Sequence, residues 1–235
     1  MPHEDFDTDS LAAYLHLSPA QIARMADREK LPGRKIGGRW RFSQAEIHHW
    51  LEERIGASDA SELVEVEEVL QGNANQTEQA TISIADHLPL AAIAIPLPAR
   101  TRSSVIVAMT QLAAKTGLLW DPEKMAEAIR ARENLHPTAL DNGVALLHAR
   151  RPMSTILAEP FLALGITPNG IPFGGGGLTD LFFLVCSCDD RGHLRLLARL
   201  SRLIGSTAVL ASLRDAQNPT EVLACIEDCE QDMPS

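Results

Sequence analysis

Aromatic residues are scarce in this chain, and several other features are missing. Phe, Trp and Tyr make up 4% of the 235 residues, whereas hydrophobic residues make up 45%. A core must therefore be built from Leu, Ile, Val and Ala. No run of about 18 apolar residues is present, and the acidic N-terminal stretch MPHEDFDTDS has no apolar centre. We therefore expect no membrane span and no signal peptide, and we place the protein in the cytoplasm.

Cysteine is also rare, and its spacing argues against a metal site. The four residues are Cys186, Cys188, Cys225 and Cys229. A C-x-C pair and a C-x3-C pair lack the C-x2-C spacing that is typical of zinc sites. Buried free thiols, which behave as small hydrophobic side chains, are favoured over the zinc alternative. We expect no metal and no cofactor.

Charge is distributed unevenly, and this divides the chain. The net charge is -10, which argues against a protein that coats nucleic acid with its whole surface. Residues 20–42 nevertheless hold seven basic and two acidic residues, whereas residues 57–85 hold six acidic residues and no Lys or Arg. A polar acidic stretch without periodicity is typical of a linker. We therefore divide the chain into a domain over 1–56, a linker over 57–83 and a domain over 84–235.

The N-terminal domain is predicted to hold three helices and a hairpin. Apolar residues at helical spacing indicate a first helix near residues 11–15. In LSPAQIARMADREK, Ser18 is an N-cap and Pro19 suits the first helical position. RKIGGRWRF reads as two short strands around a Gly-Gly turn. Ser43, with Glu46 three residues later, starts the last helix.

SLAAYLHLSPAQIARM, LPGRKIGGRWRF and AEIHHWL together resemble the small winged helix-turn-helix domains of the excisionase and MerR type. The resemblance implies a second helix in the major groove of DNA and a wing on the backbone. Arg and Lys can release counterions from phosphates, and Gln and Arg can read base edges. A solvated basic face on a protein-binding module is the alternative. Because one such domain reads a short half-site, useful specificity calls for a homodimer. The DNA-binding candidates are Ser18, Gln21, Arg24, Arg28, Lys35, Arg39 and Arg41.

The C-terminal domain alternates predicted helices with buried strands, which is typical of an α/β sandwich. SSVIVAMTQLAAKTG, PEKMAEAIRARE and HLRLLARLSRLI are predicted helices, and a last helix starts near Asn218. DLFFLVCS is a continuous apolar run and predicts a central strand. In LDNGVALLHARRP a short buried strand ends at His148, with two arginines directly after it.

Two stretches, KTGLLWDPEKMAEAIRARENLHPTALDNGVALLHAR and PFGGGGLTDLFFLVCSCDDRGHLRLLARLSRLI, are similar to the type-2 enzyme IIA domain of the phosphoenolpyruvate:sugar phosphotransferase system. This is the fructose, mannitol and nitrogen-regulatory class. The resemblance covers residues 87–230 and implies an α/β sandwich with a mixed sheet flanked by helices. It also implies that the domain accepts a phosphoryl group from the carrier HPr or a nitrogen-branch equivalent.

The same resemblance assigns roles to named residues. His148 corresponds to the phosphorylated histidine and His193 to the second histidine of the site. Arg132 and Glu133 correspond to the R-E pair of the family. Thr138, Asn142 and Gly143 correspond to the supporting loop that leads into the strand. Neutral imidazole is a good nucleophile, and transfer between imidazoles needs in-line positioning and hydrogen-bond donors for the phosphoryl oxygens, without a metal.

Two departures from the family pattern bear on activity. Leu147 stands where the family has proline, and Asp141 replaces a glycine of the loop. At about 6 Å and an effective dielectric near 20, Asp141 would oppose a phosphoryl charge by about 3 kcal/mol. We expect a regulator in which phosphorylation of His148 alters binding of DNA or of target proteins. The alternatives are a plain phosphoryl carrier with a protein-binding N-terminal domain, and an interaction module that has lost the chemistry.

Overall fold

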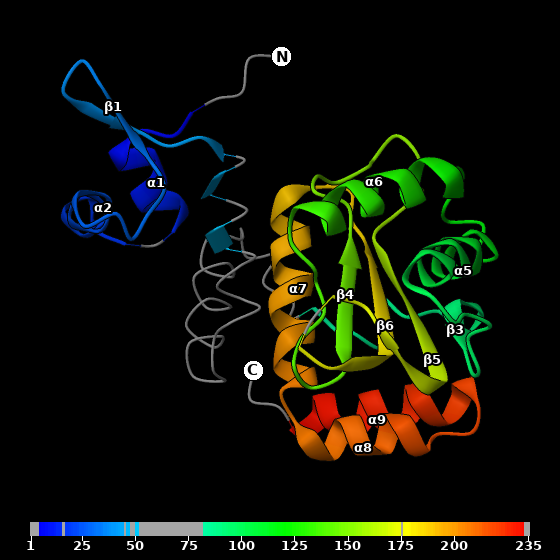
Figure 1. Cartoon of the computed structure of the whole chain (residues 1–235). Coiled ribbons are helices and arrows are strands. Elements are labelled where there is room, and N and C mark those ends of the chain that lie inside the picture. The colour runs from blue at the N-terminus through cyan, green and yellow to red at the C-terminus, as the bar shows by residue number, and fades with distance from the viewer. Residues whose placement is uncertain are drawn as a thin grey trace. The chain divides into compact units, whose positions relative to one another are not determined.

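A computed structural model describes residues 5–15, 17–44, 46–47, 50–51, 82–174 and 176–232. The chain forms two compact units, Met1–Ala80 and Thr81–Ser235, and Figure 1 colours them along the chain. All but the last two residues of the linker expected over 57–83 lie outside the described residues.

The N-terminal unit contains two helices and a hairpin where the sequence predicted them. The elements are α1 (Thr8–Tyr14), α2 (Pro19–Asp27), β1 (Arg34–Ile36) and β2 (Arg39–Arg41). Ser18 caps α2, and Pro19 opens it. Gly37 and Gly38 have φ of 58° and 78°, which suits the turn between two twisted strands. The third predicted helix is described in part, and its helical residues are Gln44, Glu46, Ile47, Trp50 and Leu51.

A mixed four-stranded sheet forms the centre of the C-terminal unit. The strands are β3 (Ile93–Ala94), β4 (Val144–His148), β5 (Phe161–Pro172) and β6 (Leu178–Cys186), in the order β3-β5-β6-β4. β5 and β6 are antiparallel, whereas β4 is parallel to β6, with His148 opposite Val185. The C-terminal ends of β4 and β6 therefore lie at the same edge of the sheet.

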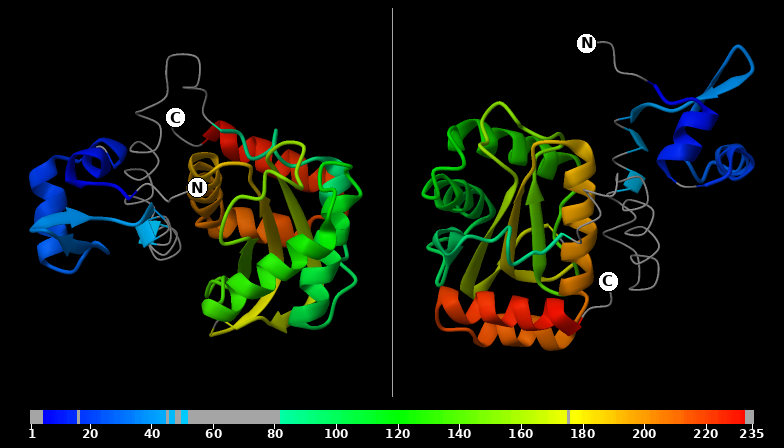
Figure 2. Two further views of the ribbon diagram at one scale, coloured as in Figure 1. Left: turned by 90° about the horizontal axis from the view of Figure 1, so that it is seen from above. Right: turned by 180° about the vertical axis from the view of Figure 1, so that it is seen from behind.

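Helices flank this sheet on both faces. They are α5 (Arg102–Ala114), α6 (Pro122–Leu135), α7 (Asp190–Ile204), α8 (Thr207–Asp215) and α9 (Pro219–Asp232), and a short 3-10 helix, η1 (Leu90–Ala92), precedes β3. Figure 2 shows α7 on one face and α5 and α6 on the other, while α8 and α9 lie across one end of the strands. The predicted sandwich with a mixed sheet flanked by helices is confirmed.

Side chains along the strands alternate between the two faces of the sheet. Leu147 of β4 and Phe182, Leu184 and Cys186 of β6 belong to the apolar core with α5 and α6. Because successive side chains point to opposite faces of a strand, His148 lies on the face that α7 covers.

Among the described helices, none is by itself long and apolar enough to cross a membrane. α7 and α8 meet that criterion only as a pair, and an 86° bend separates them.

Candidate functional site

His148 is held as a neutral imidazole at the end of β4. Its side chain is buried, with 4% of the residue exposed. Nδ1 lies 2.7 Å from the carbonyl oxygen of Leu146, and Nε2 lies 3.2 Å from Nε of Arg132. A carbonyl oxygen only accepts and an arginine Nε–H only donates, so Nδ1 carries the proton and Nε2 carries the lone pair. The unprotonated ring nitrogen of His148 is therefore Nε2.

His193 approaches the same point from α7. Asp189 caps this helix, and His193 lies in its first turn. The ring centroids of His148 and His193 are 5.2 Å apart, with the rings tilted by 56°. Ser187, in the turn that joins β6 to α7, places its hydroxyl oxygen 2.9 Å from Nδ1 of His193. The structure thus brings together two histidines that are 45 positions apart in the sequence.

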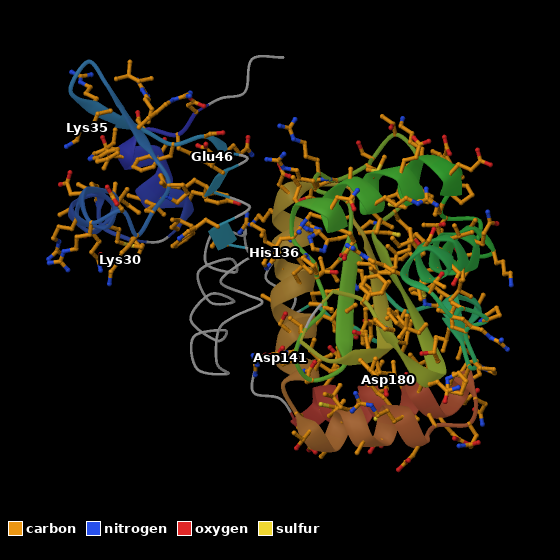
Figure 3. All side chains as sticks on the ribbon, in the orientation of Figure 1. Lys30, Lys35, Glu46, His136, Asp141 and Asp180 are labelled. Atoms are coloured by element: carbon orange, nitrogen blue, oxygen red, sulfur yellow. The ribbon has the colours of Figure 1, made fainter. Side chains whose placement is uncertain are left out.

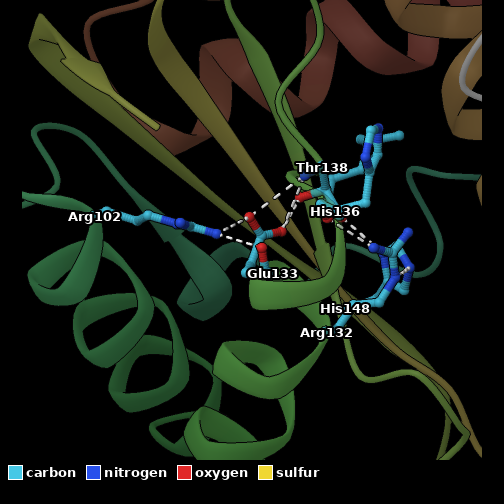
Figure 4. A network of polar contacts seen from close by, with 7 residues as sticks. Arg102, Arg132, Glu133, His136, Thr138 and His148 are labelled. Carbon is cyan, nitrogen blue, oxygen red and sulfur yellow. Dashed lines mark hydrogen bonds and ion pairs between the residues drawn. The ribbon is translucent and has the colours of Figure 1, made fainter. Parts of the chain in front are cut away.

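Arg132 points toward His148 from the last turn of α6. Besides contacting Nε2 of His148, it donates from Nη1 to the carbonyl oxygen of His136 at 2.8 Å. The guanidinium is buried, with 5% of the residue exposed. Figure 4 shows Arg132 beside His148, and the neighbouring Glu133 pointing the other way. Arg132 is therefore poised to contact a group that binds at Nε2.

Glu133 is a buried carboxylate with a different set of partners. It accepts hydrogen bonds from the backbone N–H of Thr138 at 3.2 Å and from the Thr138 hydroxyl. Nη2 of Arg102 lies 3.0 Å from its carboxylate and 2.6 Å from its main-chain oxygen. Arg102 and Ser187 were not anticipated from the sequence, because Arg102 lies in another helix and Ser187 in a turn, and neither belongs to a recognisable motif.

The remaining residues of the expected supporting loop lie at the other end of β4. Nδ2 of Asn142 donates to the carbonyl oxygen of Ile204 at 3.2 Å, at the end of α7 opposite to His193. Gly143 has φ of +87°, and a Cβ there would lie 2.7 Å from Nη2 of Arg214. Five residues of extended chain at roughly 3.3 Å per residue place Gly143 about 16 Å from His148. Asn142 and Gly143 therefore shape the start of the strand and do not contact His148.

We expected the charge of Asp141 to oppose a phosphoryl group on His148, and the same geometry corrects this expectation. Asp141 lies in the turn that the Gly143 N–H closes onto the Leu140 carbonyl oxygen, before β4 begins. Figure 3 shows Asp141 and Asp180 near α8, whereas His136 lies nearer α6. The distance of about 6 Å that we assumed between Asp141 and the phosphoryl group is wrong, because β4 separates the two. Leu147 is fully buried and packs in the apolar core.

The cysteines fall in two pairs, Cys186 with Cys188 and Cys225 with Cys229. Burial raises the pKa of the Cys186 thiol well above its usual range. Cys225 and Cys229 lie on α9, and burial also raises their pKa values. In the parts of the chain that the structure describes, no three His, Cys, Asp or Glu side chains gather closely enough to hold a metal ion.

The helix α2 presents several of the DNA-binding candidates to solvent. Ser18, Gln21, Arg24 and Arg28 are exposed. Ser18 and Gln21 are partly engaged with each other, because Oε1 of Gln21 accepts from the Ser18 backbone N–H at 2.8 Å. Nε of Arg24 donates to the Ala20 carbonyl oxygen at 3.2 Å. The amide nitrogen of Gln21, the terminal nitrogens of Arg24 and the guanidinium group of Arg28 are donors on this face.

Three basic residues of the wing pair with acidic residues of the same unit. Arg34 binds Asp5 at 2.7 Å, Lys35 binds Asp27 at 3.0 Å, and Arg41 lies 3.8 Å from Asp7. Nζ of Lys35 also lies 4.8 Å above the Trp40 ring. The positive charge counted over residues 20–42 is therefore reduced by two acids, Asp5 and Asp7, that precede the segment. Arg39, at the start of β2, is exposed.

Comparison with known proteins gives two matches along the chain. Residues 87–229 match the family described as "Phosphoenolpyruvate-dependent sugar phosphotransferase system, EIIA 2", and residues 6–55 match a helix-turn-helix domain. A nitrogen regulatory protein of Bradyrhizobium diazoefficiens is 34% identical over 135 residues, which are 54% of this chain and 88% of that protein.

Other relatives match over a smaller part of their own length or in fold alone. The fructose-specific EIIABC component of Bacillus subtilis is 25% identical over 149 residues, 62% of this chain but 23% of that protein. The crystal structure of the nitrogen regulatory protein IIA-Ntr from Neisseria meningitidis has a TM-score of 0.52 at 21% identity, covering 61% of this chain and 98% of that one. This chain therefore belongs to the EIIA 2 family of the phosphoenolpyruvate-dependent sugar phosphotransferase system, and it carries a helix-turn-helix domain before its EIIA domain.

Proposed function

We propose that His148 accepts a phosphoryl group from a phosphohistidine on an HPr-type carrier, and that its phosphorylation state controls DNA binding by the N-terminal domain. The observation that carries the first part is the arrangement of His148. Its proton is held at Nδ1 by Leu146, and its lone-pair nitrogen faces Arg132 with the His193 ring 5.2 Å away. This is the arrangement that a phosphoryl acceptor needs before the donor arrives.

The transfer step follows from these contacts. The Nε2 lone pair attacks the phosphorus atom of the donor, the P–N bond to the donor imidazole breaks, and that imidazole leaves with the bonding electron pair. As Nε2 forms its bond, positive charge develops on the His148 ring, and the Leu146 carbonyl oxygen stabilises it at Nδ1–H. Arg132 exchanges its contact with Nε2 for the phosphoryl oxygens, to which a guanidinium binds strongly. His193, near the N-terminus of α7, lies where the helix dipole favours negative charge.

Incubation with phosphoenolpyruvate, enzyme I and HPr, followed by mass spectrometry of the intact chain, tests this step. We expect one acid-labile phosphate in the wild type and in His136→Ala, and none in His148→Ala. His136 is a suitable control because it is exposed and uses only its main-chain oxygen at the site. Phosphate in His148→Ala would contradict the assignment. If the wild type took up no phosphate from HPr or from a nitrogen-branch carrier, the remaining interpretation would be an interaction module that has lost the chemistry.

The DNA-binding part is supported by the basic, exposed surface of α2 and the wing. The contacts we propose are base edges for Gln21 and Arg24 and phosphates for Arg28 and Arg39. Retention on random duplex DNA that weakens steeply with salt would support it. Comparing retention before and after phosphorylation then tests the regulatory link.

A phosphoryl carrier whose N-terminal domain binds protein is the second candidate. The ion pairs of Arg34, Lys35 and Arg41 favour it, because they reduce the charge available to phosphates. Normal phosphorylation without salt-sensitive DNA retention would support this candidate. Under either proposal the donor is a cytoplasmic carrier protein, and we place the chain in the same compartment.

A further inference from the structure

Glu133 is charged and almost inaccessible to water. Its side chain is 1% exposed, and Arg102 supplies the salt bridge at 3.0 Å. A buried carboxylate is costly unless an opposite charge and several hydrogen-bond donors surround it. Arg102 provides that charge across the gap between α5 and α6, since it is the first residue of α5 whereas Glu133 lies near the end of α6.

Arg102 contacts more than the carboxylate. Its Nη2 also donates to the main-chain oxygen of Glu133 at 2.6 Å, within the last turn of α6. The guanidinium carbon lies 5.5 Å from the centroid of the Phe173 ring, at the end of β5. One side chain thus joins α5, the last turn of α6 and the β5–β6 hairpin.

These contacts converge on residues 136–138, the segment that leads from α6 toward β4. Arg132 holds the His136 carbonyl oxygen on one side, and Glu133 holds the Thr138 backbone N–H on the other. Gly174 closes the third side, since a Cβ there would lie 2.8 Å from Pro137. Figure 4 shows Arg102 reaching Glu133 from the side opposite to His148. The direction of the Arg132 guanidinium therefore depends on where this segment lies.

The geometry points to Arg102 as a positioning residue for phosphoryl transfer: by holding Glu133 it fixes residues 136–138, and through them it aims Arg132 at Nε2 of His148. This inference rests on the proposed phosphorylation of His148. Arg102 itself does not touch the reacting atoms, so its loss affects the rate through the position of Arg132.

Arg102→Met, Arg102→Lys and a matched control test this role. Arg214→Met is the control. The Arg214 side chain is 35% exposed, against 34% for Arg102, and it also forms an ion pair, with Asp180. This pair lies near the start of β4, at the end of the strand away from His148. Phosphorylation of the full chain is followed with HPr and, separately, with phosphoramidate. The rate constant is normalised to the fraction of chains that can be phosphorylated at long times.

We expect Arg102→Met to lower the normalised maximal rate about 10- to 100-fold with both donors, since small misplacements of catalytic groups have effects of this size. The KM for HPr should stay unchanged, and Arg102→Lys should recover most of the rate, because its ammonium group can donate to both oxygens of Glu133. Arg214→Met should transfer at the wild-type rate.

Three results would overturn the inference. If Arg102→Met had the wild-type normalised rate but a smaller fraction of chains that can be phosphorylated, Arg102 would have a purely structural role. If Arg214→Met lost as much of the normalised rate as Arg102→Met, the loss would reflect general destabilisation. A wild-type chain that takes phosphate from neither donor would refute the proposed function itself, and the inference with it.

Discussion

The two units of this chain place their arginines in different surroundings. In the C-terminal unit, Arg132 is 5% exposed, and it is held by hydrogen bonds to His148 and a backbone oxygen. In the N-terminal unit, Arg24, Arg28 and Arg39 are exposed. Phosphoryl transfer needs a group fixed in place before the reaction, whereas DNA binding needs charge that can release counterions. The buried Arg132 is thus fixed by its contacts, whereas the arginines of the N-terminal unit named here face solvent.

Ion pairs in this chain also differ in burial, and the largest expected effect compares a buried pair with an exposed one. Arg199 of α7 binds Glu230 of α9 at 3.4 Å, with side chains 5% and 10% exposed. Glu230 also accepts hydrogen bonds from Ser83, Ile84 and Ala85. Arg199→Met leaves this carboxylate buried without its counter-charge, and we expect a loss of about 3–5 kcal/mol in the free energy of unfolding.

Urea unfolding, followed by a probe in each unit, measures this loss. Arg34→Met, which removes a 61% exposed partner of Asp5, is the control and should leave the midpoint of its own unit unchanged within error. Similar shifts of the urea midpoint in both variants would show that the buried ion pair stabilises its unit no more than the exposed pair does.

Arg132→Gln should give the next largest effect. Removing a donor that stabilises a transferring group typically lowers the rate about 100- to 1000-fold. Quench-flow transfer from phosphorylated HPr measures the rate constant. Arg130→Gln, two residues earlier on the same helix, is the control and should transfer normally. If both variants behaved alike, the contact between Arg132 and His148 would have no catalytic meaning.

A smaller effect should distinguish two cations of the wing. Arg39 is exposed, whereas Lys35 is bound to Asp27 and lies over Trp40. We expect Arg39→Gln to reduce the salt slope of DNA binding by about one, and Lys35→Gln to reduce it less. Titration of a duplex by fluorescence anisotropy at several salt concentrations gives both slopes. Equal slopes would mean that the Lys35–Asp27 pair does not persist on DNA.

The smallest expected effect is a pH dependence in α1. The backbone N–H of Ser10 donates to the Asp7 carboxylate and holds its pKa below the usual 3.8. A carboxyl group with a lowered folded pKa stabilises the fold above the unfolded pKa, and this contribution is lost as pH falls through the folded pKa. Amide-exchange protection of residues 8–14 should therefore fall below pH 3.8 in the wild type but change less in Asp7→Asn. If the wild type and Asp7→Asn lost protection identically as the pH fell, the Asp7 cap would not be the cause of the pH dependence.

Local patterns in the sequence were sufficient for most of the fold. Ser18 begins α2 and PEKMAEAIRARE forms α6 where expected, and the apolar run before His148 forms β4. The strand β5 and the helix α8 were not anticipated. β5 runs through Gly165, Pro168 and Gly170, residues that usually mark turns. Gly165 pairs with Phe182 of β6, whereas Pro168 and Gly170 lie between Ile166 and Ile171, where the register of the pairing shifts.

The candidate site was harder to predict, because its parts meet only in three dimensions. The family pattern nominated His148, His193 and Arg132, and they lie together in the structure. The same pattern placed Asn142 and Gly143 in the supporting loop, although the strand predicted before His148 already separates them from it along the sequence. Arg102 was missed because a salt bridge between two helices leaves no local signal.

The position of the phosphoryl group on His148 tests the central claim most directly. The phosphorylated chain is examined by ³¹P NMR, with ¹⁵N-labelled histidine to identify the bonded nitrogen. Since Leu146 holds the proton at Nδ1 and Nε2 carries the lone pair, we predict a single phosphohistidine bonded at Nε2 of His148. A phosphoryl group on Nδ1 of His148, or on His193, would contradict it.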